Sequence, residues 1–293
     1  MAIGAGPRRY EVVEGWGTLP EGWALGQVAG VAVDSQDRVY VFHRGAHPVI
    51  VFDRDGRYLS SWGDDFVKDA HGIFINRERD GEYVYLVDRD RHVVEKCTLD
   101  GRVLLQLGTP GQPGAPGQPF NRPTDVAVAP DGNLYVTDGY GNARVHQFAP
   151  RGTLLRSWGE PGDGPGQFNL PHSVWVDTRG PAPLVYVADR ENHRLQIFTP
   201  EGELVRQMPG LRRPTDLFID HAGYLYIAEL LHRVTILGPK DEPVATLGGE
   251  SSHAPGQFVA PHGVWTDSHG DLYVCEVRAG QRVQKFRRVA PGA

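Results

Sequence analysis

One internal repeat constrains the fold more than any other feature of this 293-residue chain. The repeat occurs six times, and its copies share a Gly-Val step, a Leu-Tyr-Val step, an Arg-Val step and a Phe in that order. A repeat of about 40 residues is one supersecondary unit, and it buries its apolar face only against neighbouring copies. We therefore expect a single domain over residues 1–293, with copies at roughly 28–63, 69–108, 122–159, 170–210, 212–248 and 260–289.

Each copy divides into four short apolar stretches separated by turn residues. In the third copy, strand-length stretches begin near Val126, Leu134, Arg144 and Leu154, and Gly132 and Gly152 mark two of the turns. β-branched and aromatic residues with period-two alternation are typical of strands, and no segment shows a sustained helical period. Four strands in about 40 residues make one propeller blade, so the sequence predicts an all-β, six-bladed β-propeller.

The two ends of the chain predict how the ring closes. The sixth copy stops after its third strand, at residues 282–286, so one strand of that blade is missing. Residues 10–17 form an unassigned strand that ends in Trp16-Gly17, as the fourth strands ending at Trp62-Gly63 and Trp158-Gly159 do. We expect residues 10–17 to be the outer strand of the last blade, because closure removes exposed sheet edges.

Three histidines occupy one register of alternate copies. They lie in the steps Ala70-His71, Pro171-His172 and Pro261-His262. A single histidine at a strand start is more often a structural residue than a ligand. In a six-fold ring, however, alternate repeats are about 120° apart, so the three imidazoles would converge on the axis. Three histidines with an open position are typical of catalytic zinc, and imidazole also suits other divalent transition metals such as iron, nickel, copper and cobalt.

A second register follows the second strand of most copies. Strands one and two form a hairpin, so residues after strand two return to the rim where the histidines lie. Arginines at such turns are usually solvated or paired with acids, but beside a metal they can bind a carboxylate, and a tyrosine there can transfer a proton. The residues at this register are Arg44, Arg89, Tyr140, Arg190 and Arg278.

Composition excludes some classes of function. The net charge of −6 does not favour a nucleic-acid partner, and no apolar run is long enough to cross a membrane. The first residues lack an apolar signal core, so we expect a cytoplasmic protein. Cys97 and Cys275 are expected to be buried and unpaired. The oligomeric state does not follow from the sequence.

Several segments resemble NHL repeats and, among NHL proteins, the peptidyl-α-hydroxyglycine α-amidating lyase family. The segments are Val41-Phe42-His43-Arg44-Gly45, Pro123-Thr124-Asp125-Val126, Asp138-Gly139-Tyr140-Gly141-Asn142, Gly166-Gln167-Phe168-Asn169-Leu170-Pro171-His172-Ser173 and Ala188-Asp189-Arg190-Glu191-Asn192.

The resemblance implies a role for each residue of the two registers. It implies that His71, His172 and His262 bind the catalytic zinc, that Tyr140 is the active-site tyrosine, and that Arg44 and Arg190 are the functional arginines. Arg89 and Arg278 are additional candidates for substrate contact. The chain has Gly263 where the family has an aspartate that binds a structural calcium, so a calcium site is doubtful. Gly141 replaces a disulfide cysteine of the family.

The expected activity is a zinc-dependent lyase that cleaves the C–N bond of an N-acyl-α-hydroxyglycine to an amide and glyoxylate. Its partner would be a small-molecule or peptide-like substrate that carries a carboxylate. Two alternatives stay open: a metal-dependent propeller hydrolase or lactonase, and a non-catalytic NHL interaction module. The acyl group of the substrate does not follow from the sequence.

Overall fold

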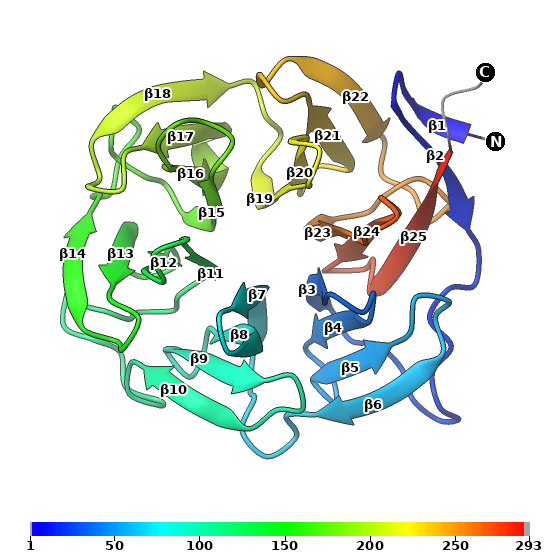
Figure 1. Cartoon of the computed structure of the whole chain (residues 1–293), viewed down its shortest axis with the longest axis horizontal. Coiled ribbons are helices and arrows are strands. Elements are labelled where there is room, and N and C mark those ends of the chain that lie inside the picture. The colour runs from blue at the N-terminus through cyan, green and yellow to red at the C-terminus, as the bar shows by residue number, and fades with distance from the viewer. Residues whose placement is uncertain (1, 290–293) are drawn as a thin grey trace. The chain divides into compact units, whose positions relative to one another are not determined.

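The computed structural model describes residues 2–289, and within them the chain is built from strands with one short 3₁₀ helix. The strands form six antiparallel sheets, which are the blades of a six-bladed β-propeller, as the repeat predicted. Five of these sheets take their strands in chain order, and the sixth has the order β1-β2-β25-β24-β23 (Figure 1). The chain divides into two compact units, Met1–Asp64 with Thr215–Ala293, and Asp65–Pro214, which we describe separately.

The central unit, Asp65–Pro214, holds the second, third and fourth blades. In these blades the first strands contact one another, since β11 lies against both β7 and β15. The second blade comprises β7 (Ala70–Glu78), β8 (Gly81–Asp88), β9 (Val93–Thr98) and β10 (Val103–Leu107). The third comprises β11 (Asp125–Val128), β12 (Leu134–Asp138), β13 (Arg144–Phe148) and β14 (Leu154–Trp158). The fourth comprises β15 (Pro171–Asp177), β16 (Leu184–Asp189), β17 (Arg194–Phe198) and β18 (Leu204–Pro209), with the 3₁₀ helix η1 (Arg190–Asn192).

The terminal unit holds the first, fifth and sixth blades. The first comprises β3 (Val28–Val33), β4 (Val39–His43), β5 (Val49–Phe52) and β6 (Tyr58–Trp62). The fifth comprises β19 (Pro214–Ile219), β20 (Leu225–Glu229), β21 (Arg233–Leu237) and β22 (Pro243–Gly248). The sixth comprises β23 (Pro261–Thr266), β24 (Leu272–Glu276) and β25 (Arg282–Val289), completed by β2 (Arg8–Val13) and β1 (Ala2–Ala5). Within this unit β23 contacts both β3 and β20.

The N-terminal strand does close the last blade. β2 pairs antiparallel with β25, with Val12 opposite Phe286 (Figure 1). The predicted bounds of 10–17 were wrong, because the strand ends at Val13 and the next residues turn through Gly15 and Gly17, whose φ angles are +70° and +90°. Such left-handed backbone cannot continue a strand. β1, which pairs with β2 as a fifth strand, was not predicted.

The core of each blade is built from its inner strands. All residues of β3, β4 and β5 are buried, whereas β6 is exposed along most of its length. A tyrosine in the second strand of every blade is almost completely buried, namely Tyr40, Tyr85, Tyr135, Tyr186, Tyr226 and Tyr273. Burying an aromatic side chain of this size stabilises the fold by about 1.5–3 kcal/mol, so these positions fix the register of each blade.

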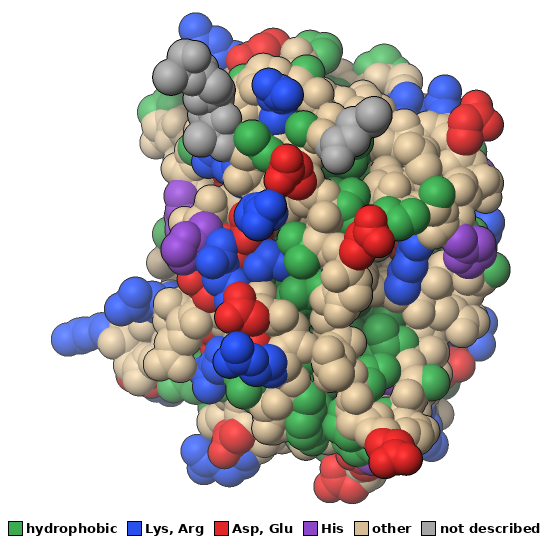
Figure 2. Space-filling view, turned by 90° about the vertical axis from the view of Figure 1, so that its right-hand side faces the viewer, with side chains coloured by type: hydrophobic (Ala, Val, Ile, Leu, Met, Phe, Trp, Pro, Cys, Tyr) green, Lys and Arg blue, Asp and Glu red, His purple; other side chains and the backbone are tan. Residues whose placement is uncertain are grey.

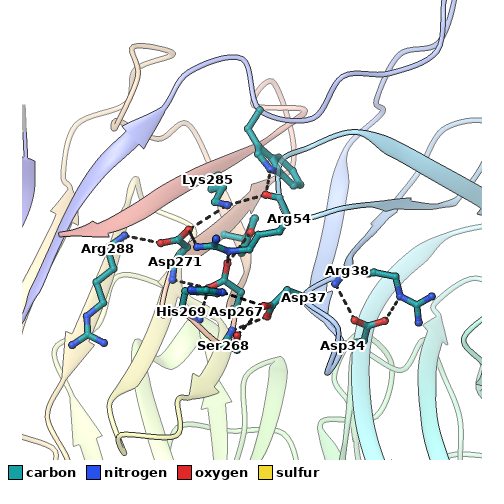
Figure 3. A network of polar contacts seen from close by, with 12 residues as sticks. Asp34, Asp37, Arg38, Arg54, Asp267, Ser268, His269, Asp271, Lys285 and Arg288 are labelled. Carbon is teal, nitrogen blue, oxygen red and sulfur yellow. Dashed lines mark hydrogen bonds and ion pairs between the residues drawn. The ribbon is translucent and has the colours of Figure 1, made fainter. Parts of the chain in front are cut away.

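A charged cluster joins the first and last blades inside the terminal unit (Figure 3). The Arg54 guanidinium binds the Asp267 carboxylate at 2.8 Å and the Asp271 carboxylate at 2.6 Å. The backbone oxygen of Arg54 accepts hydrogen bonds from Trp16 Nε1 at 3.0 Å and from Lys285 Nζ at 2.8 Å. Trp16-Gly17 therefore does not extend the closing strand; it fixes the chain against this cluster.

The surface and the cysteines agree with the composition. The face shown in Figure 2 carries basic and acidic side chains side by side, without a surface of one sign. Cys97 and Cys275 are buried and unpaired, as expected. No helix within residues 2–289 is long and apolar enough to span a membrane.

Candidate functional site

Hairpin register places histidines and arginines at the same end of the blades. In the second blade Ala70 pairs with Asp88, and in the fourth Pro171 pairs with Asp189. His71 is therefore close to the end of β8 and His172 close to the end of β16. The turn that follows each second strand begins with an arginine, so both blades present the same two residue types.

His71 has a defined orientation. Its side chain is 1% exposed, and its Nδ1 lies 2.6 Å from the carbonyl oxygen of Thr124 in the neighbouring blade. A carbonyl only accepts, so Nδ1 carries the proton, and in the neutral ring Nε2 presents a lone pair. Nε2 lies 3.2 Å from the Tyr140 hydroxyl. The Tyr140 hydroxyl therefore donates to His71.

Tyr140 brings the third blade to both histidines. It follows β12 and is half-buried, and its ring meets the ring of His71 edge to face at 5.4 Å between centroids and that of His172 at 6.1 Å. The two imidazole centroids are 4.7 Å apart, and one ring nitrogen of each lies within 4.8 Å of the other. Three residues predicted from two separate registers thus lie together in the central unit.

Arg190 lies on the other side of the Tyr140 hydroxyl. Its Nη1 donates to that oxygen at 3.4 Å, and its guanidinium lies 5.6 Å from the centre of the ring. Arg190 Nε also donates to Glu191 at 2.8 Å, and Glu191 accepts a second, short hydrogen bond from Arg213. Burial alone would raise the pKa of Glu191, but Arg213 and Arg190 outweigh it and hold that pKa below its usual value. Two arginines share one carboxylate, which leaves one positive charge over.

Arg89 is a second arginine close to the Tyr140 ring. Its guanidinium is 5.0 Å from the centre of the Tyr140 ring, and its Nε is 2.5 Å from Asp69 and 3.5 Å from Asp90. Asp90 also pairs with Arg122 at 3.2 Å. Two arginines here meet two carboxylates, so this group is balanced in charge. The electrostatic difference between Arg190 and Arg89 was not visible in the sequence, where both simply follow an aspartate.

The Thr124-Asp125 step positions both histidine strands, which sequence reasoning missed. The Thr124 carbonyl binds His71, and its Oγ1 donates to the Pro171 carbonyl at 2.9 Å. The Asp125 carboxylate accepts from Ser173 Oγ at 2.7 Å, next to His172. Burial raises the pKa of Asp125 to about 7, although the hydrogen bonds that the carboxylate accepts lower it. The repetition of Pro-Thr-Asp in the third and fifth blades was the available signal.

His262 repeats this arrangement in the terminal unit. It is 4% exposed, and its Nδ1 donates to the Ala29 carbonyl at 2.6 Å, which again leaves Nε2 as the acceptor. Thr215 Oγ1 donates to the Pro261 carbonyl at 3.0 Å, and Asp216 accepts from the backbone N–H of Val264 at 2.8 Å. The three predicted histidines are thus buried and offer one ring nitrogen each, a set that could bind a metal ion.

Arg44 and Arg278 both contact Gln27, just before β3 in the terminal unit. Arg44 Nη1 donates to Gln27 Oε1 at 3.3 Å, and the backbone N–H of Arg278 donates to the same oxygen at 3.1 Å. Arg44 is half-buried, whereas Arg278 is exposed. The structure therefore brings these two predicted residues to one place, and their contact with substrate stays a prediction.

Comparison with known proteins places this site in a family. The NHL repeat model matches residues 120–148 and 168–198. NHL repeat-containing protein 3 of Homo sapiens is 34% identical over 298 residues, covering 94% of this chain and 84% of that protein. The chain belongs to the NHL-repeat family. Peptidyl-alpha-hydroxyglycine alpha-amidating lyase 1 of Drosophila melanogaster is 31% identical, covering 89% of this chain and 57% of that relative, so the family of the amidating lyases is the one the motifs indicated.

The solved structures support the fold of this NHL-repeat protein. A streptogramin B lyase superposes with a TM-score of 0.66 over 95% of this chain and 97% of that chain, at 12% sequence identity. At this identity the likeness shows the propeller fold only. The family as a whole includes propeller enzymes.

Proposed function

We propose that this NHL-repeat protein is a metal-dependent lyase that cleaves an N-acyl-α-hydroxyglycine to an amide and glyoxylate. The observation that carries the proposal is the hydrogen-bonded chain from Arg190 through Tyr140 to His71, with His172 beside it. It combines a cation, a proton-transferring hydroxyl and two imidazoles in the central unit. A related lyase named for this reaction supports the assignment.

The histidines fit a metal ion. A neutral imidazole that donates from Nδ1 to a backbone carbonyl is held in the tautomer and orientation that a metal ligand requires. His71 and His262 both have this hydrogen bond, at 2.6 Å each. We propose that His71, His172 and His262 together bind one transition metal, with zinc favoured because three histidines and an open position match its catalytic sites. When bound, the metal would act as a Lewis acid toward the substrate hydroxyl. No residue set for a structural calcium is proposed.

Tyr140 is the proposed proton-transfer residue. Its hydroxyl lies 3.2 Å from His71 Nε2, the nitrogen that would hold the metal. With that lone pair occupied, the phenol would no longer donate to His71, and a substrate hydroxyl beside His71 would be within reach of the phenol oxygen. Tyr140 would accept or relay the hydroxyl proton, the electron pair of that O–H bond would form the carbonyl of glyoxylate, and the C–N bond would break. The amide nitrogen that leaves takes up one proton, so the reaction is balanced without an oxidant or a further reactant.

Arg190 is the proposed binder of the substrate carboxylate. Its group with Glu191 and Arg213 has one positive charge in excess, whereas the Arg89 group is balanced. An uncompensated, nearly buried guanidinium attracts a carboxylate and forms a bidentate pair with it. Arg44 is proposed as a second cation for the charge that develops in the reaction. Arg89 would mainly hold the Tyr140 ring, and Arg278 stays a weaker candidate for substrate contact.

Metal analysis and a glyoxylate assay test this function. Purified protein is analysed for metals and then assayed over a panel of N-acyl-α-hydroxyglycines, before and after chelation and reloading with zinc. We expect one metal per chain, stoichiometric glyoxylate and amide, and loss of both metal and activity in His172→Ala. His221→Ala, an exposed histidine on another turn, is the matched control and should change neither.

The same experiment separates the alternatives. Protein that purifies without metal and releases no glyoxylate would instead be a non-catalytic NHL module. Metal without glyoxylate release, but with ester or lactone hydrolysis, would identify a propeller hydrolase. Cytoplasmic location stays a prediction, and comparing the enzyme in cell fractions would test it.

A further inference from the structure

A second cavity lies at the end of the blades away from the histidines, wholly inside the central unit. It has a volume of about 520 Å³ and is lined by Phe74 in β7 and Trp175 in β15, and by the turn at Pro130. The histidines stand at the beginnings of the same strands, at His71 and His172. A volume of this size suits a small organic ligand, for which pockets of about 300–1,000 Å³ are usual.

The β7–β8 hairpin supplies the charge of this cavity. β7 and β8 have nine and eight residues, whereas β11 and β12 have four and five. The extra length carries Arg77 and Arg79 to the cavity wall. Both side chains are exposed, and within residues 2–289 neither has a hydrogen bond or ion pair. In the Arg77-Glu78-Arg79-Asp80 turn, the two guanidinium groups therefore make no contact that holds the turn in place.

Two acids that line this cavity already have partners of their own. Glu78 accepts from Tyr85 at 2.6 Å and from Lys96 at 2.7 Å. Asp131 caps its own turn through the backbone N–H and the side chain of Asn133. Asp80 follows Arg79 in the chain and Glu82 lies opposite Arg77 in the β7–β8 ladder, but within the described residues no side-chain contact joins either acid to Arg77 or Arg79. Both guanidinium groups can therefore still donate to an anionic head group.

An apolar pocket continues from this cavity. It encloses about 250 Å³ and shares the wall at Ala129–Asp131 and at Val176 with the first cavity. Its remaining lining includes Tyr135, Pro181 and Pro183. Prolines and an aromatic ring offer rigid hydrocarbon surface with few donors, so they suit the hydrocarbon part of a ligand.

We propose that these two connected cavities form a second binding site for an amphipathic carboxylate, with its head group at Arg77 and Arg79 and its hydrocarbon body at Trp175 and the prolines. This site is separate from the site that contains His71 and His172, and it does not depend on the proposed lyase activity. Occupancy would bridge the second, third and fourth blades at their far end. The ligand class is a medium-chain or aromatic carboxylic acid.

Decanoate is the probe, and decanol is its neutral counterpart. Binding to the intact protein is measured by calorimetry and by quenching of tryptophan fluorescence, below the micelle concentration. We expect saturable binding of decanoate, at least tenfold weaker binding of decanol, and loss of the quenching signal in Trp175→Phe. The double variant Arg77→Ala/Arg79→Ala should bind decanoate at least tenfold more weakly, since a charge-assisted hydrogen bond to a carboxylate contributes about tenfold or more in affinity.

Three controls locate the site. Arg102→Ala removes an exposed arginine of the same unit that lines neither cavity, and it should bind as the wild type does. The conservative double variant Arg77→Lys/Arg79→Lys should recover part of the affinity. His172→Ala should bind decanoate normally. Equal binding of decanol, unchanged binding in the double alanine variant, or loss of binding in His172→Ala would each overturn the proposal.

Discussion

Replacing Tyr140 by phenylalanine isolates the hydroxyl that the proposed mechanism uses. The hydroxyl donates to His71 at 3.2 Å and accepts from Arg190 at 3.4 Å. Both distances exceed the roughly 2.9–3.0 Å that is usual between nitrogen and oxygen, so each contributes at most about 1 kcal/mol to stability. The ring keeps its contacts with Arg89 and Arg190, and the free energy of unfolding should fall by no more than about 1 kcal/mol.

The effect on catalysis should be much larger. General acid–base catalysis contributes about 10²–10⁴ in rate, and a factor of 10² corresponds to about 2.7 kcal/mol in the activation free energy. We therefore expect kcat of Tyr140→Phe to fall by about 10² or more, with metal content and folding unchanged. Single-turnover release of glyoxylate measures the chemical step, and urea unfolding measures stability. Tyr58→Phe, at an exposed position, is the matched control and should retain full activity.

A wild-type rate of the chemical step in Tyr140→Phe would refute this reasoning. The phenol would then be only a packing residue beside Arg89 and Arg190, and another group would take the proton. A loss of metal together with activity would also contradict it, because the hydroxyl would then act through the His71 ligand rather than on the substrate.

Three further changes test other parts of the molecule. Arg190→Lys should lower kcat/KM at least tenfold, because an ammonium cannot form the bidentate pair with a carboxylate, and substrate kinetics measure it. Arg54→Ala should lower the free energy of unfolding by about 2–3 kcal/mol in urea titrations, since it leaves the buried Asp267 carboxylate without its cation. Burial lowers the pKa of His43 below 6.5, and the ring must stay neutral to accept from Gly26 N–H. Because the folded pKa is the lower one, stability should fall as the pH falls below about 6.5, and less so in His43→Asn.

Each of these predictions has a contradicting result. An Arg190→Lys enzyme as efficient as the wild type would remove Arg190 from carboxylate binding, particularly if Arg89→Lys were the damaging change. An unchanged urea midpoint in Arg54→Ala would mean that Lys285 and Tyr273 stabilise the Asp267 and Asp271 carboxylates without Arg54. Equal loss of stability between pH 7.5 and 5.5 in the wild type and in His43→Asn would assign the pH dependence to other groups.

The repeat determined the fold of this chain from sequence alone. Strand patterns recur at fixed spacing, and a blade can bury its inner strands only against other blades, so the number and type of sheets followed directly. The missing fourth strand of the last copy also predicted that an N-terminal strand completes it, as β2 does against β25. The predicted bounds of that strand were wrong because Gly15 and Gly17 adopt a left-handed backbone conformation. That conformation depends on where the Trp16 side chain packs.

The residue types of the candidate site also followed from the repeat. The repeat placed His71 and His172 at the beginnings of first strands. It placed Arg89, Tyr140 and Arg190 just after second strands. Antiparallel pairing returns the chain to the same end of the blade, so both sets were expected at one end. Contacts between blades did not follow, since they join distant residues: Thr124 contacts His71 and Pro171, which are 53 and 47 positions away. Only the tertiary structure showed that the Thr124 carbonyl fixes the tautomer of His71.

Charge balance was decided by the tertiary structure as well. Arg89 and Arg190 both follow an aspartate in the sequence. Arg89 meets two carboxylates, one of which also pairs with Arg122, whereas Arg190 shares one carboxylate with Arg213. The same is true of Arg77 and Arg79, whose lack of acidic partners depends on how Glu78 folds back onto Tyr85 and Lys96. Local sequence sets which side chains a blade presents, whereas the electrostatic field at each one comes from neighbours that only folding brings close.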